Sequence, residues 1–263
     1  MSKSPTISTI NLKPGTVILV DGDKGGVGKS WWSCTLLDWL LEQKVSVAAV
    51  DADTRNADVH RMFKGIMPVL HANLREHTGW MDLLDFLVAN PNAITVVSLP
   101  AGIGDTMKKE GGSFIKNMKM LNRNLGLMWV MNRQADSVNL LNQALGHVGS
   151  ALNFKVAVKN LMYGESERFI RWDSSNTRKK FESSGGVTID LTELHERTVD
   201  KLTGDSTDQA DVIMPFSHAV MPVSDTANSI HKLTPSENLE LINWITTNHD
   251  TLTQQVAPLM ASA

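Results

Sequence analysis

The chain has 263 residues, of which 42% are hydrophobic, so it is long enough to bury one sizeable core. Its formal net charge of −3 excludes a surface that is basic throughout, although a local basic face remains compatible with it. The single cysteine, Cys34, excludes an intrachain disulfide and a multi-cysteine zinc site, and we expect it to be a small core residue.

Short apolar segments alternate with helical patterns along the chain. Strands are predicted at 16–21, 46–51, 94–99, 126–131, 154–159 and 211–214. Helices are predicted at 29–43, 79–89, 105–122, 136–148, 165–181, 191–202 and 235–247. Apolar strands separated by helices are typical of a parallel sheet covered on both faces. We therefore expect an α/β fold, a doubly wound and mostly parallel sheet with helices on both faces.

The first predicted strand is followed by a glycine-rich phosphate-binding loop. The loop residues are Lys24, Gly25, Gly26, Val27, Gly28, Lys29 and Ser30. Glycines let the backbone turn its N–H groups toward phosphate oxygens, and the helix that begins there adds its positive dipole end. We expect Lys29 to reach the β- and γ-phosphates and the Ser30 hydroxyl to bind Mg²⁺. A plain strand-to-helix turn is the alternative, which this context disfavours.

Acidic residues follow the second predicted strand, where they would face the phosphate loop. Asp51 and Asp53 carry carboxylates, which can bind Mg²⁺ and orient an attacking water. Without the phosphate loop, a charged turn would be the better interpretation. The third predicted strand ends in a tight turn that contains Ser98, Pro100, Ala101 and Gly102, and the Gly102 N–H could approach a γ-phosphate.

The loop lacks the usual first glycine, which is replaced by Asp23, and carries the added Lys24. In this it resembles the ParA/MinD superfamily of deviant Walker-A ATPases. The resemblance implies a P-loop fold, ATP as ligand, and a nucleotide-sandwich homodimer in which Lys24 reaches the nucleotide of the other subunit. It also implies that Asp51 lies near the metal and that Asp53 positions or polarises the attacking water, so Lys24 and Asp53 are the predicted catalytic residues.

Further positions match the family's nucleotide contacts or depart from them. The turn at Ser98 resembles the family's switch II, where an aspartate is usual, so we expect weaker metal coupling and slow hydrolysis. Trp31 stands where the family has a threonine that touches the α-phosphate. Asn160 matches the adenine contact, and Pro215 and Phe216 match the loop that covers the base, which favours ATP over GTP.

A basic stripe would form if 165–181 were one continuous helix. Its members are Arg168, Arg171, Arg178 and Lys179. Such a stripe could contact DNA phosphates or a DNA-bound adaptor, and a solvated charged face is at least as consistent with it.

The whole chain, 1–263, is predicted to be one domain, with 1–15 as an N-terminal extension and 248–263 as a C-terminal tail. The start is polar, and the last predicted helix, expected to be capped by Ser236, is followed by no lysine or arginine. We therefore expect no signal peptide and no basic membrane anchor. We expect a cytoplasmic protein, either free or associated with the nucleoid or a plasmid.

Within the superfamily the motifs look closest to the plasmid-encoded StbB/TraL/MobD group. The resemblance implies an ATP-dependent dimeric switch in plasmid stability, partition or positioning, or conjugative transfer, with ATP and Mg²⁺ as cofactors and slow hydrolysis. The first alternative is a nucleotide-locked adaptor that recruits a DNA-bound partner. The second is a carboxylase-ligase of the dethiobiotin synthetase type, which the presence of Lys24 disfavours.

Overall fold

The computed structural model describes residues 11–22, 24–203, 213–222, 225–226 and 229–262. Most of the predicted N-terminal extension, residue 23 of the phosphate loop, and residues 211 and 212 of a predicted strand lie outside these ranges. Residues 213 and 214 are described and belong to no strand.

The described residues form one parallel sheet of seven strands. The strands are β1 (Val17–Asp21), β2 (Val47–Asp51), β3 (Val69–His71), β4 (Ile94–Ser98), β5 (Leu125–Met131), β6 (Phe154–Asn160) and β7 (Val187–Leu191). Their order across the sheet is β3-β2-β4-β1-β5-β6-β7, and every pair is parallel. The doubly wound α/β fold expected from the sequence is confirmed.

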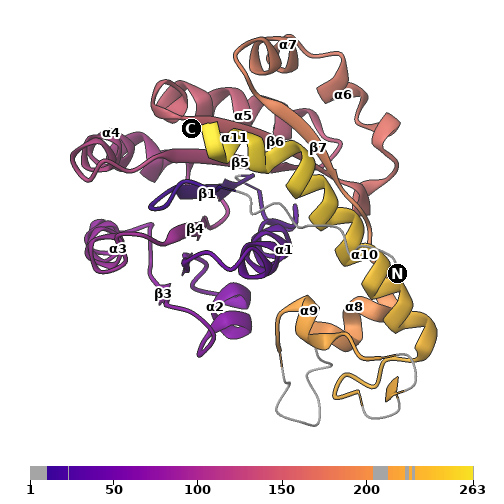
Figure 1. Cartoon of the computed structure of the whole chain (residues 1–263). Helices are drawn as coiled ribbons and strands as arrows, with labels where there is room; N and C mark the ends of the chain where they lie inside the picture. Colours follow the sequence, from indigo (N-terminus) through magenta and orange to yellow (C-terminus); the bar gives the residue numbers. More distant parts are fainter. Residues whose placement is uncertain (1–10, 23, 204–212, 223–224, 227–228, 263) are drawn as a thin grey trace.

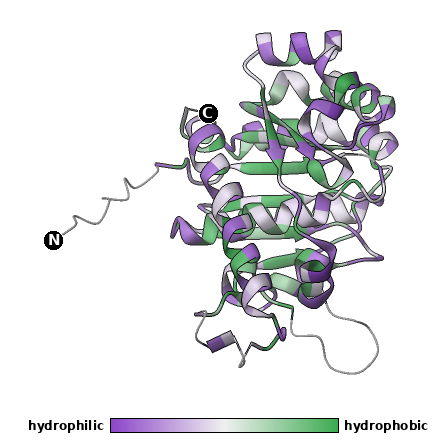
Figure 2. Cartoon of the chain, turned by 90° about the vertical axis from the view of Figure 1, so that its right-hand side faces the viewer, coloured by the Kyte–Doolittle hydropathy of each residue, from purple (hydrophilic) through white to green (hydrophobic). Residues whose placement is uncertain are grey.

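Helices cover both faces of this sheet (Figure 1). One face is covered by α1 (Lys29–Glu42), α2 (Asp58–Phe63), α8 (Glu196–Thr203), α9 (Phe216–Ala219), α10 (Pro235–Thr251) and α11 (Ala257–Ser262). The other is covered by α3 (His77–Ala89), α4 (Gly104–Met120), α5 (Ala135–Val148), α6 (Ile170–Asp173) and α7 (Asn176–Ser183). Figure 2 shows the strands as the most hydrophobic layer, because their side chains point alternately into two cores.

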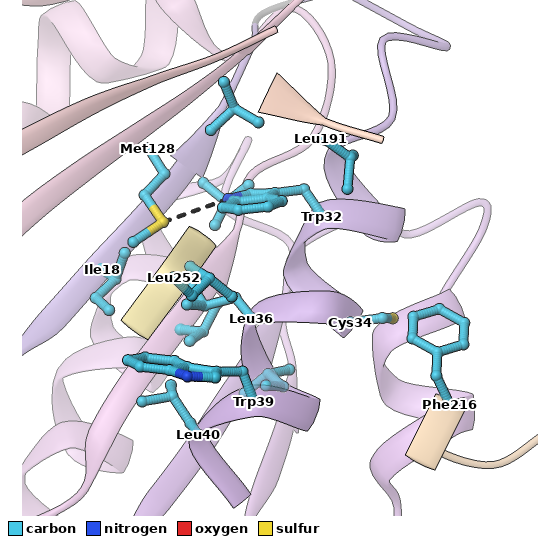
Figure 3. Packing of buried hydrophobic residues seen from close by; sticks show 14 of the residues in the cluster. Ile18, Trp32, Cys34, Leu36, Trp39, Leu40, Met128, Leu191, Phe216 and Leu252 are labelled. Carbon is cyan, nitrogen blue, oxygen red and sulfur yellow. Dashed lines mark hydrogen bonds between the residues drawn. The ribbon is translucent and has the colours of Figure 1, made fainter. Parts of the chain in front are cut away.

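The core beside β1 is built around helix α1 (Figure 3). Trp32 and Trp39 are both fully buried, and each still finds a partner for its indole N–H. Trp32 donates to the sulfur of Met128 at 3.3 Å, and Trp39 donates to the Thr253 hydroxyl at 3.0 Å. Cys34 is buried beside them as predicted, and burial raises the pKa of its thiol. Helix α1 is thus fixed to both the sheet and the C-terminal helices.

Two strands were missed by the sequence analysis, and both lie at edges of the sheet. β3 has only three residues, and β7 alternates apolar residues with Thr188 and Asp190, so neither gives a continuous apolar signal. Among the described residues the last strand in the chain is β7.

The predicted helix 165–181 is broken into short pieces. Ser166–Arg168 is a 3₁₀ turn, α6 ends at Asp173, and α7 begins after Ser175. The Ser175 hydroxyl accepts the N–H of Arg178 at 2.9 Å, which is an N-cap that starts a new helix. The basic stripe, which required one continuous helix over 165–181, is therefore not formed.

The C-terminal segment is helical to residue 262. Helix α10 is capped by Thr234 and not by Ser236, through a capping box in which Thr234 and Glu237 exchange hydrogen bonds. Beyond the predicted end at 247, it continues through a π-helical turn (Leu252–Val256) into α11, and Leu252, Val256 and Met260 are buried. No helix among the described residues is long and apolar enough to cross a membrane.

Glu237 links α10 to α8. Its carboxylate accepts the Thr234 N–H at 2.6 Å and pairs with Lys201 at 2.7 Å and Arg197 at 2.6 Å. Burial opposes its ionisation, but the hydrogen bonds from Lys201 and Thr234 outweigh burial and lower the pKa of Glu237 to about 2.

The first prediction concerns this carboxylate. A pKa that is lower in the folded state stabilises the fold above the unfolded-state value near 4.5, and the stabilisation is lost as the pH falls toward 2. We expect Glu237→Gln to lower the free energy of unfolding by roughly 2 kcal/mol at pH 7 and by roughly 1 kcal/mol at pH 3. Urea unfolding at both pH values measures this, with the exposed Glu196→Gln as control. An equal loss at both pH values would contradict it.

Candidate functional site

The phosphate loop lies where the winding of the sheet changes direction. β1 is central, and its neighbours β4 and β5 belong to the two halves of the sheet. Ligands of doubly wound sheets bind at this place, beyond the carboxyl ends of the strands. The loop closes tightly because Gly26 and Gly28 adopt φ angles of +75° and +96°, which other residues rarely reach. Helix α1 then begins at Lys29.

Asn160, at the end of β6, holds the loop from behind. Its Nδ2 donates to the Val27 carbonyl at 2.9 Å, and its Oδ1 accepts the Met162 N–H at 3.1 Å. A Cβ on Gly28 would lie 2.3 Å from Asn160 Nδ2, so only glycine fits there. The Tyr163 hydroxyl donates to the Gly26 carbonyl. These contacts fix the curvature of the loop.

A cavity of about 350 Å³ opens in front of the loop. Gly25, Gly26, Gly28, Lys29, Ser30 and Trp31 form its phosphate-loop side, and Asp53, Asn56 and Asp58 form its acidic side. Leu99 and Ala101 of switch II, and Asn160 and Met162 after β6, complete this part of the wall. The structure thus brings together most of the predicted nucleotide site.

The two lysines of the loop point to different places. Lys29 lines the cavity, and its ammonium donates to the Lys24 carbonyl at 2.6 Å. Lys24 lies outside the cavity of its own chain. Its ammonium reaches the start of α5, where it pairs with Asp136 at 2.6 Å and donates to Gln134 at 3.3 Å. The hydrogen bond from Lys24 lowers the pKa of Asp136.

Asp51 and Asp53 have different surroundings. Asp51 is buried, and its two carboxylate oxygens accept the N–H groups of Asp53 at 3.1 Å and His60 at 3.0 Å. Burial raises the pKa of Asp51. Asp51 is not among the residues that line the cavity, and its carboxylate fixes the backbone of the segment after β2. Its place near the metal stays a prediction.

Asp53 does line the cavity, and its Oδ1 accepts the N–H groups of Arg55 and Asn56. Magnesium in nucleotide sites usually takes one or two protein oxygens together with phosphate oxygens and water. Ser30 and Asp53 supply hard oxygen donors in one cavity, which fits such an ion. The described residues contain no cluster of three or more His, Cys, Asp or Glu side chains that could hold a metal without a nucleotide.

Switch II lies between two cavities. Ser98 ends β4 in register with Asp51, and Ser98 and Pro100 are buried. Ala101 faces the nucleotide cavity, whereas Gly102, with φ +67°, lines a second cavity of about 450 Å³ between α4 and α5. Gly102 is not among the residues that line the nucleotide cavity, and the approach of its N–H to a γ-phosphate stays a prediction.

One side of the cavity is lined by residues that the sequence analysis did not name. Thr192, Glu193 and Leu194, which follow β7, line it, and they were missed because β7 was not recognised. Pro215 and Phe216 do not line it. The Phe216 ring is buried behind Trp31, with ring centroids 4.6 Å apart, so it packs behind the wall of the cavity. The contact of Pro215 and Phe216 with a base stays a prediction.

The four basic residues of the predicted stripe are separated. Arg178 pairs with Asp173 and, at 2.8 Å, with Glu182, and Lys179 is exposed on α7. Arg168 and Arg171 instead line a different concavity near the start of α5.

The second prediction tests the support of the loop. We expect Asn160→Ala to weaken ATP binding by roughly tenfold or more, because the carbonyl of Val27 loses a hydrogen bond of about 1–3 kcal/mol. Isothermal titration calorimetry measures this. Asn153→Ala is the matched control, since Asn153 caps the opposite end of β6 through Leu125 N–H. Wild-type affinity in Asn160→Ala would contradict the assignment.

Comparison with known proteins agrees with this geometry. Residues 18–253 match the CobQ/CobB/MinD/ParA nucleotide binding domain. Protein MobD of Acidithiobacillus ferrooxidans is 30% identical over 187 residues, which cover 71% of this chain and 82% of MobD. A solved nucleotide-binding protein of Archaeoglobus fulgidus in complex with ADP has a TM-score of 0.45 and 16% identity, over 68% of this chain and 83% of that one, which is too distant to carry an argument.

Proposed function

Because the chain belongs to the CobQ/CobB/MinD/ParA family of nucleotide-binding domains, and to a MobD-like group within it, we propose that it is an ATP-dependent dimeric switch. The observation that carries the proposal is the position of Lys24. Its ammonium lies outside its own cavity, at an exposed pair with Asp136, where a second subunit could meet it.

The cavity supports ATP as the ligand. The loop glycines and the start of α1 would hold the phosphates, and the Lys29 ammonium would exchange the Lys24 carbonyl for phosphate oxygens. Ser30 and Asp53 would hold Mg²⁺, which neutralises charge on the transferred phosphate when bound. The apolar wall near Leu194, with Asn160 beside it, would receive the adenine.

Dimerisation would bring a second lysine ammonium, in addition to that of Lys29, to each triphosphate. In the proposed dimer, Lys24 leaves Asp136 and reaches the nucleotide of the partner subunit. Asp53 then orients the water, while Ser98 offers only a neutral hydroxyl where a carboxylate would couple switch II to the metal. Slow turnover follows, because less charge is positioned where negative charge develops in the reaction.

We further propose that the joined form acts in plasmid stability, positioning or conjugative transfer, by binding DNA or a DNA-bound adaptor. The similarity to MobD supports this assignment. The alternative is a nucleotide-locked adaptor, in which ATP is a structural ligand. The neutral Ser98, which stands where the family has an aspartate, is the observation that favours this alternative.

The third prediction concerns Lys24. We expect Lys24→Ala to bind ATP with an affinity within about threefold of wild type, because Lys24 lies outside its own cavity. We also expect it to lose ATP-dependent dimers and to fall to background hydrolysis. Light scattering and phosphate release, each with and without duplex DNA, measure these effects. ATP-dependent dimers of Lys24→Ala would contradict the proposal.

The fourth prediction tests whether Ser98 limits the rate of ATP hydrolysis, which is the point on which the switch and the locked adaptor differ. We expect Ser98→Asp to raise ATP hydrolysis on the order of tenfold, since about 1.4 kcal/mol of added electrostatic coupling is enough for that change. Ser98→Asn is the control of similar size without charge. A rate unchanged in Ser98→Asp would show that Ser98 does not limit turnover.

A further inference from the structure

Three arginines surround a concavity of about 580 Å³ beside the phosphate loop. We call it the arginine concavity, and its arginines are Arg133, Arg168 and Arg171. We propose that it binds the phosphodiester backbone of a nucleic acid. This deepens the proposed function and rests on it, because it names the surface by which the switch holds DNA directly.

The three arginines come from three separate segments. Arg133 lies between β5 and α5, Arg168 ends the 3₁₀ turn after β6, and Arg171 lies in α6. Gly164 brings two of them together, since a Cβ there would lie 3.2 Å from Arg168 Cδ and 3.5 Å from Arg133 Nη1. Its φ of +118° is also one that other residues rarely adopt. The breaks that disrupt the expected helical stripe are what direct Arg168 and Arg171 to the same place.

The charges of these arginines are not neutralised by neighbouring carboxylates. None of the three forms an ion pair with another residue in the part of the chain that the structure describes. Arg178, by contrast, pairs with two carboxylates. The acidic residue of the wall, Asp136, is already paired with Lys24. A chain with net charge −3 therefore keeps a local positive surface here.

The shape of the surface favours a polymer backbone over a small anion. All three arginines are exposed, so no buried group encloses a single ligand. Arginine guanidinium groups bind phosphate oxygens through paired hydrogen bonds and tolerate water and counterions around them. The start of α5 lies in the same wall, at Gln134 and Ala135, and adds the positive end of a 14-residue helix.

Two residues connect this surface with the phosphate loop. Tyr163 lines the concavity and donates to the Gly26 carbonyl. Asp136 lines it too and holds Lys24. The wall of the concavity therefore contains one carboxylate, Asp136, whose negative charge opposes the binding of phosphate. Removing that carboxylate should therefore strengthen nucleic-acid binding, whereas removing the arginines should weaken it.

The test uses the full chain with ATP and fluorescence anisotropy of a short labelled duplex DNA over a series of salt concentrations. We expect the triple variant Arg133→Ala, Arg168→Ala, Arg171→Ala to bind at least about tenfold more weakly. We also expect its plot of log affinity against log salt to be shallower by about three, one for each lost phosphate contact. Asp136→Asn should bind about threefold or more tightly. Arg178→Ala is the matched control and should bind like wild type.

Unchanged affinity and salt slope in the triple variant would overturn the proposal, as would an equal loss in Arg178→Ala. The proposal would also be overturned if the wild-type protein bound polyglutamate and did not bind DNA, because an acidic peptide would then be the ligand. ATP binding and thermal unfolding are measured for every variant. If the wild type does not bind ATP, the proposed switch is rejected. If the wild type binds ATP and the triple variant binds DNA with the affinity and salt slope of the wild type, only the arginine concavity is rejected.

Discussion

The phosphate loop keeps its shape because one asparagine side chain holds its backbone. Asn160 satisfies the Val27 carbonyl on one side and the Met162 N–H on the other, so it joins the loop after β1 to the turn after β6. Two left-handed glycines make the curve possible, and Gly28 in addition leaves room for the amide. The nucleotide cavity, the position of Lys29 and the nearby Tyr163 contact all depend on this junction between two strands.

Charged groups around the loop are divided between two surfaces. Asp53 and Asp58 line the nucleotide cavity, where a magnesium ion and a lysine would balance them. The arginine concavity lies on the other side of the loop, and Lys24 lies next to it through Asp136. The Lys24–Asp136 pair therefore joins the loop that would hold the nucleotide to the wall of the proposed nucleic-acid surface.

Much of the site could be predicted from the sequence because phosphate binding needs few residue types at fixed spacing. The glycines, Lys29 and Ser30 are adjacent in the chain, and a buried strand before them and a helix after them give them their geometry. The central strands were predicted for a similar reason, since strands buried on both faces are apolar throughout. Cavity residues that come from distant segments were not predicted. Thr192 and Glu193 are examples, because they follow β7, an edge strand that mixes apolar and polar residues.

The sequence by itself determined the fold class, the phosphate loop and the family, because each rests on local pattern. Tertiary structure alone decided what the remaining side chains do. It turned Asp51 toward backbone N–H groups, buried Phe216 behind Trp31, and paired Arg178 with carboxylates. These outcomes depend on which segments pack against one another. Long-range packing and breaks in helices decide this, and neither produces a periodic pattern in the sequence.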